Sequence, residues 1–205
     1  MPTDPYGGRA PTSHERRAGA PWDASYRDGP APWDVGRPQP AIVRVAERFS
    51  GPVLDAGCGT GENALHVAAL GLPVLGVDVA ETAVALAREK AAARGSDARF
   101  EVGDALHLPR LKLTFTTVLD CGLFHTFDGD ERRAYVQGLG AVTRAGGEVF
   151  VLCLNDEPHP VGEAELHAAF ASGWDVVSIV PERIETRFHA DGAHAWLATV
   201  RRVPL

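Results

Sequence analysis

The sequence predicts an α/β fold, in which helices cover both faces of a mainly parallel, seven-stranded sheet. Short apolar segments alternate along the chain with longer segments of helical periodicity, a pattern typical of parallel strands joined by helical crossovers. The first apolar segment runs directly into three closely spaced glycines and then into a helix-like stretch. Near the end of the chain, two strand-like segments flank an Asp-Gly pair, which indicates an antiparallel hairpin at the sheet edge.

Each element expected in the first half of the chain has its own signal. Residues 41–49 have the spacing of a short amphipathic helix. Residues 53–55 and 74–77 are apolar runs of strand length, and residues 62–70 between them have helical spacing. A third helix is expected over residues 81–93. A glycine lies one or two residues beyond the helices at 62–70 and 81–93, as is common after a helix end.

The second half continues the same alternation and then departs from it. A strand is expected before each acidic or glycine-rich turn, and a helix is expected wherever apolar residues recur three or four positions apart. The last two strands are expected to form a hairpin. In chain order the elements are strand 100–102, strand 116–119, helix 130–142, strand 149–154, helix 163–170, and the paired strands 176–180 and 195–200.

Composition at the start of the chain suggests three parts. Residues 1–20 are rich in Pro, Gly and Arg with almost no large apolar residue, so we expect a mobile tail. Residues 21–40 precede the regular alternation, and residues 41–205 form one predicted domain.

Charge and cysteine content exclude several classes of function. The 205 residues are 45% hydrophobic and 23% charged, with a formal net charge of −7, so we expect no nucleic-acid partner. The three cysteines include no CxxC pair, which argues against a disulfide framework or a zinc site, and we expect no metal. No segment approaches the roughly 20 apolar residues of a membrane span, so we expect no membrane partner and a cytoplasmic location.

The turn after the first strand is the most informative motif. Residues 53–61 read Val-Leu-Asp-Ala-Gly-Cys-Gly-Thr-Gly, and the next helix starts near Glu62. Glycine allows the backbone to turn sharply and approach a ligand, while the free N–H groups of the helix point toward it. A dinucleotide fingerprint needs its third glycine where Glu62 stands. A nucleoside with an amino-acid tail does not need that spacing.

An aspartate follows each of the first four strands, where ligands of open α/β sheets bind. These residues are Asp55, Asp78, Asp104 and Asp120. Any one of them could be only a turn or cap residue, but four beside a glycine turn indicate a site. Asp78 ends the second strand, where a carboxylate can accept hydrogen bonds from both ribose hydroxyls. Acidic surroundings also suit a cation and argue against a polyphosphate.

The glycine turn, opened by Asp55, resembles motif I of the class I S-adenosylmethionine (SAM) methyltransferases. Residues 32–40, Pro-Trp-Asp-Val-Gly-Arg-Pro-Gln-Pro, resemble the thiopurine methyltransferase-like branch, which includes the halide/thiol and tellurite-resistance methyltransferases. The resemblance spans roughly residues 22–203 and also covers residues 77–78, 103–104, 120–127 and 146–148. It implies a Rossmann-like fold, SAM as cofactor with S-adenosylhomocysteine as product, and a small-molecule acceptor.

The same resemblance implies a role for the N-terminal segment and for several cofactor contacts. Residues 21–40 would form a lid, with Trp33 against the sulfonium and Arg37 pairing with the methionine carboxylate. The alternatives are surface packing for Trp33 and an exposed charge for Arg37. Asp104 would accept from the adenine amino group, with the Ala105 N–H beside it. The other implied contacts are Asp55, Gly57, Cys58, Gly59, Gly61, Val79 and Asp120.

The acceptor is expected to meet the block of residues 120–127. His125 is the candidate base, because histidine titrates near neutral pH; a packed or substrate-shaping histidine is the alternative. Cys121 is not expected to act as a nucleophile, since direct methyl transfer needs no covalent intermediate. The remaining candidate acceptor contacts are Trp22, Tyr26, Cys121, Phe124, Phe127 and His159.

These inferences together predict a SAM-dependent methyltransferase acting on a small molecule. A thiol is the preferred acceptor, because a thiol with a pKa near 8.5 is partly ionised at neutral pH, whereas a phenol near 10 benefits from a base. The alternative is O- or N-methylation of an aromatic or heterocyclic compound. A SAM-binding protein without catalysis and an NAD-binding oxidoreductase are rivals from other classes.

Overall fold

The computed structural model describes residues 4–157 and 160–204 and contains one seven-stranded sheet in the order β3-β2-β1-β4-β5-β7-β6. In chain order the strands are β1 (Val53–Ala56), β2 (Val74–Asp78), β3 (Arg99–Val102), β4 (Phe115–Cys121), β5 (Thr143–Leu154), β6 (Trp174–Ile184) and β7 (Ala193–Arg202). The first five strands pair in parallel, and β7 runs antiparallel to both β5 and β6. The predicted α/β sheet with an antiparallel C-terminal hairpin is confirmed.

Helices cover both faces of the sheet, because successive strand residues point to opposite sides. One apolar core joins Phe150 to side chains of α3, α4 and α5, and the other joins Val151 to side chains of η2, α6 and α7. The bounds are α3 (Pro40–Val45), the 3-10 helix η1 (Ala46–Arg48), α4 (Glu62–Ala69), α5 (Glu81–Arg94), the 3-10 helix η2 (Ala105–Leu111), α6 (Gly129–Val142) and α7 (Glu163–Ala169).

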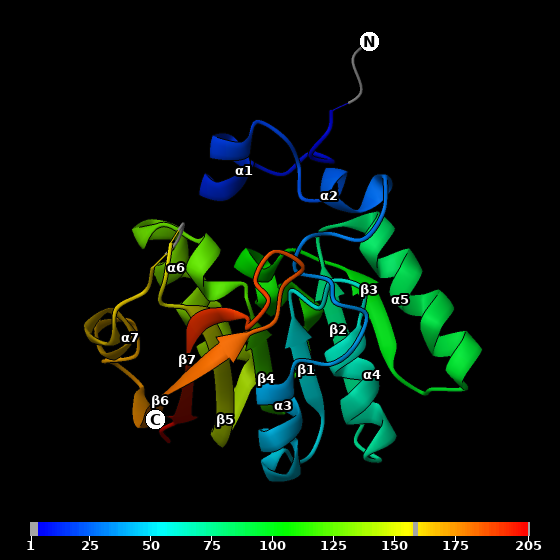
Figure 1. Ribbon diagram of the computed structural model, residues 1–205. Coiled ribbons are helices and arrows are strands. Elements are labelled where there is room, and N and C mark those ends of the chain that lie inside the picture. The colour runs from blue at the N-terminus through cyan, green and yellow to red at the C-terminus, as the bar shows by residue number, and fades with distance from the viewer. Residues whose placement is uncertain (1–3, 158–159, 205) are drawn as a thin grey trace.

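Figure 1 shows two N-terminal helices, α1 (Ser13–Ala18) and α2 (Ala24–Arg27), above the edge of the sheet where the parallel strands end. The loop between β6 and β7 rises toward them from the other side. The N-terminal segment therefore covers the edge at which ligands of α/β sheets bind.

The expectation of a mobile tail over residues 1–20 differs from the structure. Thr12 and Glu15 form a capping box at the start of α1, and Ser13 and Glu15 are buried. Polar contacts hold this segment in place: Ser13 of α1 hydrogen-bonds to α6, and Glu15 forms an ion pair with Arg9. A prediction based on low hydrophobicity does not detect such contacts.

Several strands are longer than expected, and the difference is largest at the start of β5. Gly146 and Gly147, which precede the strand expected over residues 149–154, lie inside β5, which begins at Thr143 and shifts register against β4. A Cβ on Gly147 would lie 2.7 Å from the Thr116 carbonyl oxygen, so the close approach of the two strands requires glycine there.

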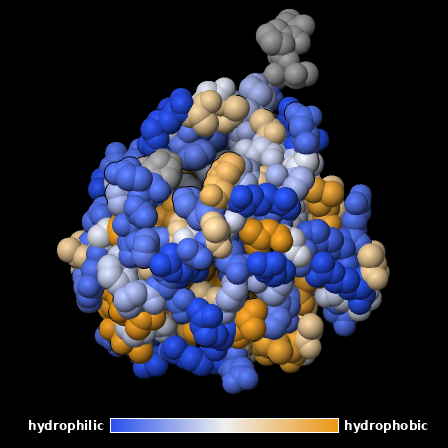
Figure 2. All heavy atoms as spheres, in the orientation of Figure 1, coloured by the Kyte–Doolittle hydropathy of each residue, from blue (hydrophilic) through white to orange (hydrophobic). Residues whose placement is uncertain are grey.

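The face shown in Figure 2 is mostly hydrophilic, with hydrophobic side chains in small scattered patches. Among the described residues, no helix has both the length and the apolar character needed to cross a membrane.

Candidate functional site

A cavity of about 410 Å³ lies at the carboxyl ends of the strands, beneath the N-terminal segment. Its walls come from the N-terminal segment, the glycine turn, the ends of β2, β3 and β4, and the β6–β7 loop. The sequence-predicted site residues that line it are Trp22, Tyr26, Trp33, Arg37, Gly57, Cys58, Gly59, Gly61, Asp78, Val79, Asp104, Ala105, Cys121, His125 and Phe127. Asp55, Asp120 and Phe124 are buried behind this wall, and His159 lies outside the described residues.

The glycine turn presents bare backbone to the cavity. Gly57 and Gly59 have φ values of +73° and +52°, which L side chains rarely adopt. A Cβ on Gly59 would lie 3.1 Å from the Tyr26 hydroxyl oxygen. Gly61 serves a different purpose, because a Cβ there would lie 2.7 Å from the Phe100 ring and would separate α4 from the sheet.

Asp78 holds this turn against the end of β2. Its carboxylate accepts hydrogen bonds from the backbone N–H of Gly59 at 2.8 Å and of Ala80 at 2.9 Å. Burial raises the pKa of Asp78, and these backbone donors oppose the increase. The carboxylate is thus fixed in orientation at the cavity wall.

Asp55 and Asp120 are both buried, but only Asp120 is satisfied by protein donors. Asp120 accepts from the backbone N–H of Leu123 and from the Tyr135 hydroxyl, each at 2.9 Å, and burial raises its pKa to about 6. Neither oxygen of Asp55 has a partner at hydrogen-bond distance and angle in the described chain. Burial, followed by the nearby Asp120 and Asp78 carboxylates, raises the pKa of Asp55 to about 8, and the Ala64 N–H offsets only part of this.

Asp104 caps the 3-10 helix η2. Its carboxylate accepts from the Leu106 N–H and contacts His107 Nδ1, both at 2.9 Å. The cap places the first residue of η2, Ala105, on the cavity wall.

Three aromatic side chains of the N-terminal segment contact one another over the cavity. The Trp33 indole N–H donates to the Tyr26 hydroxyl at 2.9 Å, and the Trp22 and Trp33 rings meet edge to face at 5.6 Å. His14 stacks flat on Trp22 with ring centroids 4.0 Å apart. Arg37 also reaches the cavity, but its guanidinium pairs with Glu185 at 2.9 Å and its side chain is 64% exposed.

Hydrogen bonds tie this segment to three other elements. The Asp34 carboxylate accepts from the Thr60 hydroxyl at 2.7 Å, and its carbonyl accepts from the Arg187 guanidinium at 2.6 Å. Asp23 accepts from the Thr82 N–H at the start of α5, at 2.7 Å. The segment is thereby attached to the glycine turn, to α5 and to the β6–β7 loop.

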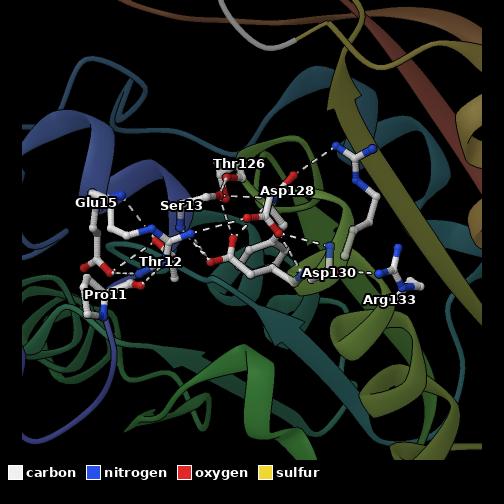
Figure 3. Close-up of polar contacts among 12 residues, drawn as sticks. Pro11, Thr12, Ser13, Glu15, Thr126, Asp128, Asp130 and Arg133 are labelled. Carbon is white, nitrogen blue, oxygen red and sulfur yellow. Dashed lines mark hydrogen bonds and ion pairs between the residues drawn. The ribbon is translucent and has the colours of Figure 1, made fainter.

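Figure 3 shows the polar contacts that join α1 to the start of α6. The Glu131 carboxylate accepts from the Ser13 N–H at 2.7 Å and from the Ser13 hydroxyl at 2.6 Å, while Asp128 caps α6. The buried Glu15 carboxylate pairs with Arg9 and accepts from the Trp22 N–H at 3.0 Å. These contacts fix His14 and Trp22 beside the block that carries His125.

His125 lies on the 3-10 helix η3 (Phe124–Thr126), and its Nδ1 accepts a hydrogen bond from the Leu154 N–H at 3.3 Å. This bond uses the Nδ1 lone pair, so the proton of the neutral ring is on Nε2. Cys121 is protonated, since burial raises the pKa of its thiol well above the ordinary value. Phe124 is fully buried and stacks on Phe170, so it supports the cavity wall only from beneath.

Several wall residues were not predicted. Thr12 and His14 come from α1, and Thr186, Phe188 and His189 come from the β6–β7 loop. The capping-box pattern from Thr12 to Glu15 was readable in the sequence and would have revealed α1. No local pattern marks the loop residues. Within the described chain, no group of three or more His, Cys, Asp or Glu side chains is arranged to hold a metal ion.

Comparison with known proteins finds a match over residues 53–147 to the family model described as "Methyltransferase domain". A Mycobacteroides abscessus protein, 2-heptyl-1-hydroxyquinolin-4(1H)-one methyltransferase, is 36% identical over 164 residues, which cover 75% of this chain and 72% of that protein. "Probable thiol methyltransferase 2" of Arabidopsis thaliana is 27% identical over 174 residues, covering 80% of this chain and 77% of the relative.

The fold of this chain is also similar to those of solved structures. A structure described as "Conversion of a Disulfide Bond into a Thioacetal Group during Echinomycin Biosynthesis" has a TM-score of 0.77 and 40% identity, covering 84% of this chain and 85% of the other. Magnesium protoporphyrin IX methyltransferase from Synechocystis, with bound SAM, has a TM-score of 0.64 and 21% identity, covering 79% and 74% of the two chains. The latter likeness concerns the fold alone.

Proposed function

This chain belongs to the class I SAM-dependent methyltransferases, and on that basis we propose that it methylates a hydroxyl oxygen on a planar aromatic heterocycle. The observation that carries the proposal is a cavity that combines a bare glycine turn with an aromatic wall. The aromatic side chains that line the cavity include Trp22, Phe127 and Phe188. Flat apolar surfaces of this kind suit a planar ring.

The residues present fit SAM. Two glycines at positive φ leave room for a nucleoside against the backbone. The carboxylates of Asp34, Asp78 and Asp104 line the cavity, and acidic surroundings of this kind favour a cationic group. When bound, SAM supplies a methyl group already activated by the sulfonium, so positioning and exclusion of water are the main tasks left to the protein.

We assign roles on this basis as part of the proposal. Asp78 would accept from the ribose hydroxyls with the lone pairs that its backbone donors leave open. Asp104 and the Ala105 N–H would contact the adenine, and the Trp33 ring would face the sulfonium. Arg37 would exchange Glu185 for the methionine carboxylate. Residues 21–40 would act as a lid, with Asp34 anchoring it to the glycine turn.

Sulfur is the second candidate for the accepting atom. The structural relative at 40% identity acts in a conversion of a disulfide into a thioacetal, and a thiol methyltransferase is among the sequence relatives. The curated relative at 36% identity methylates a hydroxyquinolone. The aromatic wall accommodates an aromatic thiol as well as a hydroxyl, but it gives no reason for selecting a small inorganic anion.

A screen with radiolabelled SAM tests the proposal. The acceptors should form matched pairs, such as 1-hydroxyquinolin-4-one with a quinoline thiol, alongside hydrosulfide and iodide. We expect the hydroxylated heterocycle to give the highest kcat/KM and the inorganic anions to give the lowest. Preference for the thiol in each pair would support the second candidate, and transfer to none of the aromatic compounds would refute the proposal.

A further inference from the structure

We propose that the acceptor binds as an anion, in a groove rich in positive charge, and that His125 donates a hydrogen bond to it instead of removing its proton. This rests on the proposed function, since it concerns the acceptor end of the same cavity. The groove has a volume of about 650 Å³ and lies between α1, η3 and α6. It shares His14, His125 and Phe127 with the main cavity, so the two adjoin at these side chains.

Charge is divided between the two ends of the site. The cofactor end contains the carboxylates of Asp34, Asp78 and Asp104. The described residues lining the groove include no carboxylate, and those with a charged or titratable side chain are His14, Arg17, His125 and Arg132. In a chain of net charge −7, this local excess of positive charge favours an anionic ligand at the acceptor end.

Arg132 is fixed in place by its surroundings. Its guanidinium lies over the Phe124 ring at 4.8 Å, donates to the Phe127 carbonyl at 3.1 Å and pairs with Glu165 at 3.2 Å. Its Nε–H is buried and has no partner among the described residues. Arg17, by contrast, is exposed and makes no ion pair or hydrogen bond with any described side chain.

The tautomer of His125 points to the same conclusion. Because Nδ1 accepts from the Leu154 N–H, the neutral ring presents an N–H at Nε2 and has no lone pair left there to take up a proton. A donor at this position stabilises an anionic acceptor. The residue therefore suits hydrogen bonding to the acceptor better than general-base catalysis.

The reaction balances without a protein base. The acceptor releases its proton to solvent before it binds, and its lone pair then forms the bond to the methyl carbon. The pair of the breaking carbon–sulfur bond remains on sulfur. An anion and a sulfonium thus become two neutral products, and a cavity shielded from water favours this loss of charge.

Other titratable groups that face the site are on neighbouring elements. Glu165 on α7 is already paired with Arg132. Glu157, after β5, and His189, in the β6–β7 loop, line the main cavity but not the groove. The pH dependence that we expect is therefore set by ionisation of the acceptor itself.

The first test compares pH profiles of kcat/KM for two hydroxylated heterocycles whose hydroxyl pKa values lie on either side of neutrality. We expect each profile to rise and level off at the pKa of its own acceptor. The His125→Gln variant, which can donate a hydrogen bond but cannot act as a base, should retain most of the activity that His125→Ala loses. A fall in activity above the acceptor pKa, or a His125→Gln variant as inactive as His125→Ala, would overturn the proposal.

The second test measures acceptor binding without turnover, by calorimetry in the presence of S-adenosylhomocysteine. We expect Arg132→Gln to weaken binding of the ionised acceptor by about tenfold, with little effect on a methoxy analogue that cannot ionise. Arg133→Gln is the control, because Arg133 is 76% exposed and pairs with Asp130 outside the groove. Equal losses for both ligands would overturn the proposal. Failure to methylate any aromatic acceptor refutes the proposed function instead.

Discussion

At the scale of single residues, the two buried carboxylates of β1 and β4 differ in how they are satisfied. Asp120 receives hydrogen bonds from Leu123, Phe124 and Tyr135, so the protein itself accounts for its burial. Asp55 is equally buried, but its oxygens lack a partner in the described chain. A native buried group left in this way requires an explanation, and its raised pKa, which keeps the carboxyl protonated and neutral near pH 7, provides one.

The pH dependence of stability should reveal Asp55 in the free protein. Its pKa is raised from 3.8 to about 8, so between these values the folded state binds more protons than the unfolded state, and stability falls as pH rises. We expect the wild type to lose several degrees more in Tm than Asp55→Asn between about pH 5 and pH 8, since about 1 kcal/mol shifts Tm by about 2–4 °C at this size. Thermal unfolding followed by circular dichroism measures this.

Asp175→Asn is the matched control, because Asp175 is an exposed carboxylate on β6. It should follow the wild-type curve at every pH. If Asp55→Asn keeps the wild-type slope, Asp55 does not titrate in this range, and its carboxylate is satisfied in a way that the geometry does not show.

At the scale of elements, α1 links the N-terminal segment to the groove that His125 lines, the end of the site that we propose for the acceptor. It is only six residues long, too short to be stable by itself. Its position depends on Ser13, whose N–H and hydroxyl both donate to Glu131, and on the Thr12–Glu15 capping box. A short helix held by side-chain contacts far apart in the sequence has little local signal apart from its cap.

Removing one of these contacts should impair use of the acceptor and spare the cofactor. We expect Ser13→Ala to lower kcat/KM for the acceptor by about tenfold, because it deletes a hydrogen bond to a charged group. The affinity for S-adenosylhomocysteine, measured by calorimetry, should stay within about twofold. Arg133→Gln serves as control: Arg133 on α6 pairs with Asp130, and both side chains are largely exposed, so little change is expected. A parallel loss of cofactor affinity in Ser13→Ala would show that α1 supports the whole cavity.

At the scale of the whole molecule, the sequence predicted the sheet because each strand carries its own apolar run and each turn its own glycine or aspartate. The convergence of Asp78 and Asp104 on one cavity followed from the parallel topology alone. Contacts between distant residues were not predictable in this way. The pairing of Arg37 with Glu185 and the hydrogen bond from Leu154 to His125 join segments with no shared local pattern. They determine how residues 21–40 are held and which nitrogen of the neutral His125 ring carries the proton.

The whole fold should respond to the cofactor, because the cavity joins the N-terminal segment, the glycine turn and the β6–β7 loop. A ligand at 100 times its Kd stabilises the folded state by about 2.7 kcal/mol, so we expect S-adenosylhomocysteine to raise Tm by roughly 5–10 °C. NADH at the same concentration should give no shift, since Glu62 occupies the position of the third dinucleotide glycine.

The Asp78→Ala variant should lose at least about 1.4 kcal/mol of binding free energy for S-adenosylhomocysteine, or tenfold in Kd. Its Tm should therefore rise less at an equal ligand concentration. Comparable Tm shifts with S-adenosylhomocysteine and NADH would mean that the glycine turn does not exclude a dinucleotide. An unchanged shift in Asp78→Ala would mean that the turn binds its ligand without the ribose contact that we assign to Asp78.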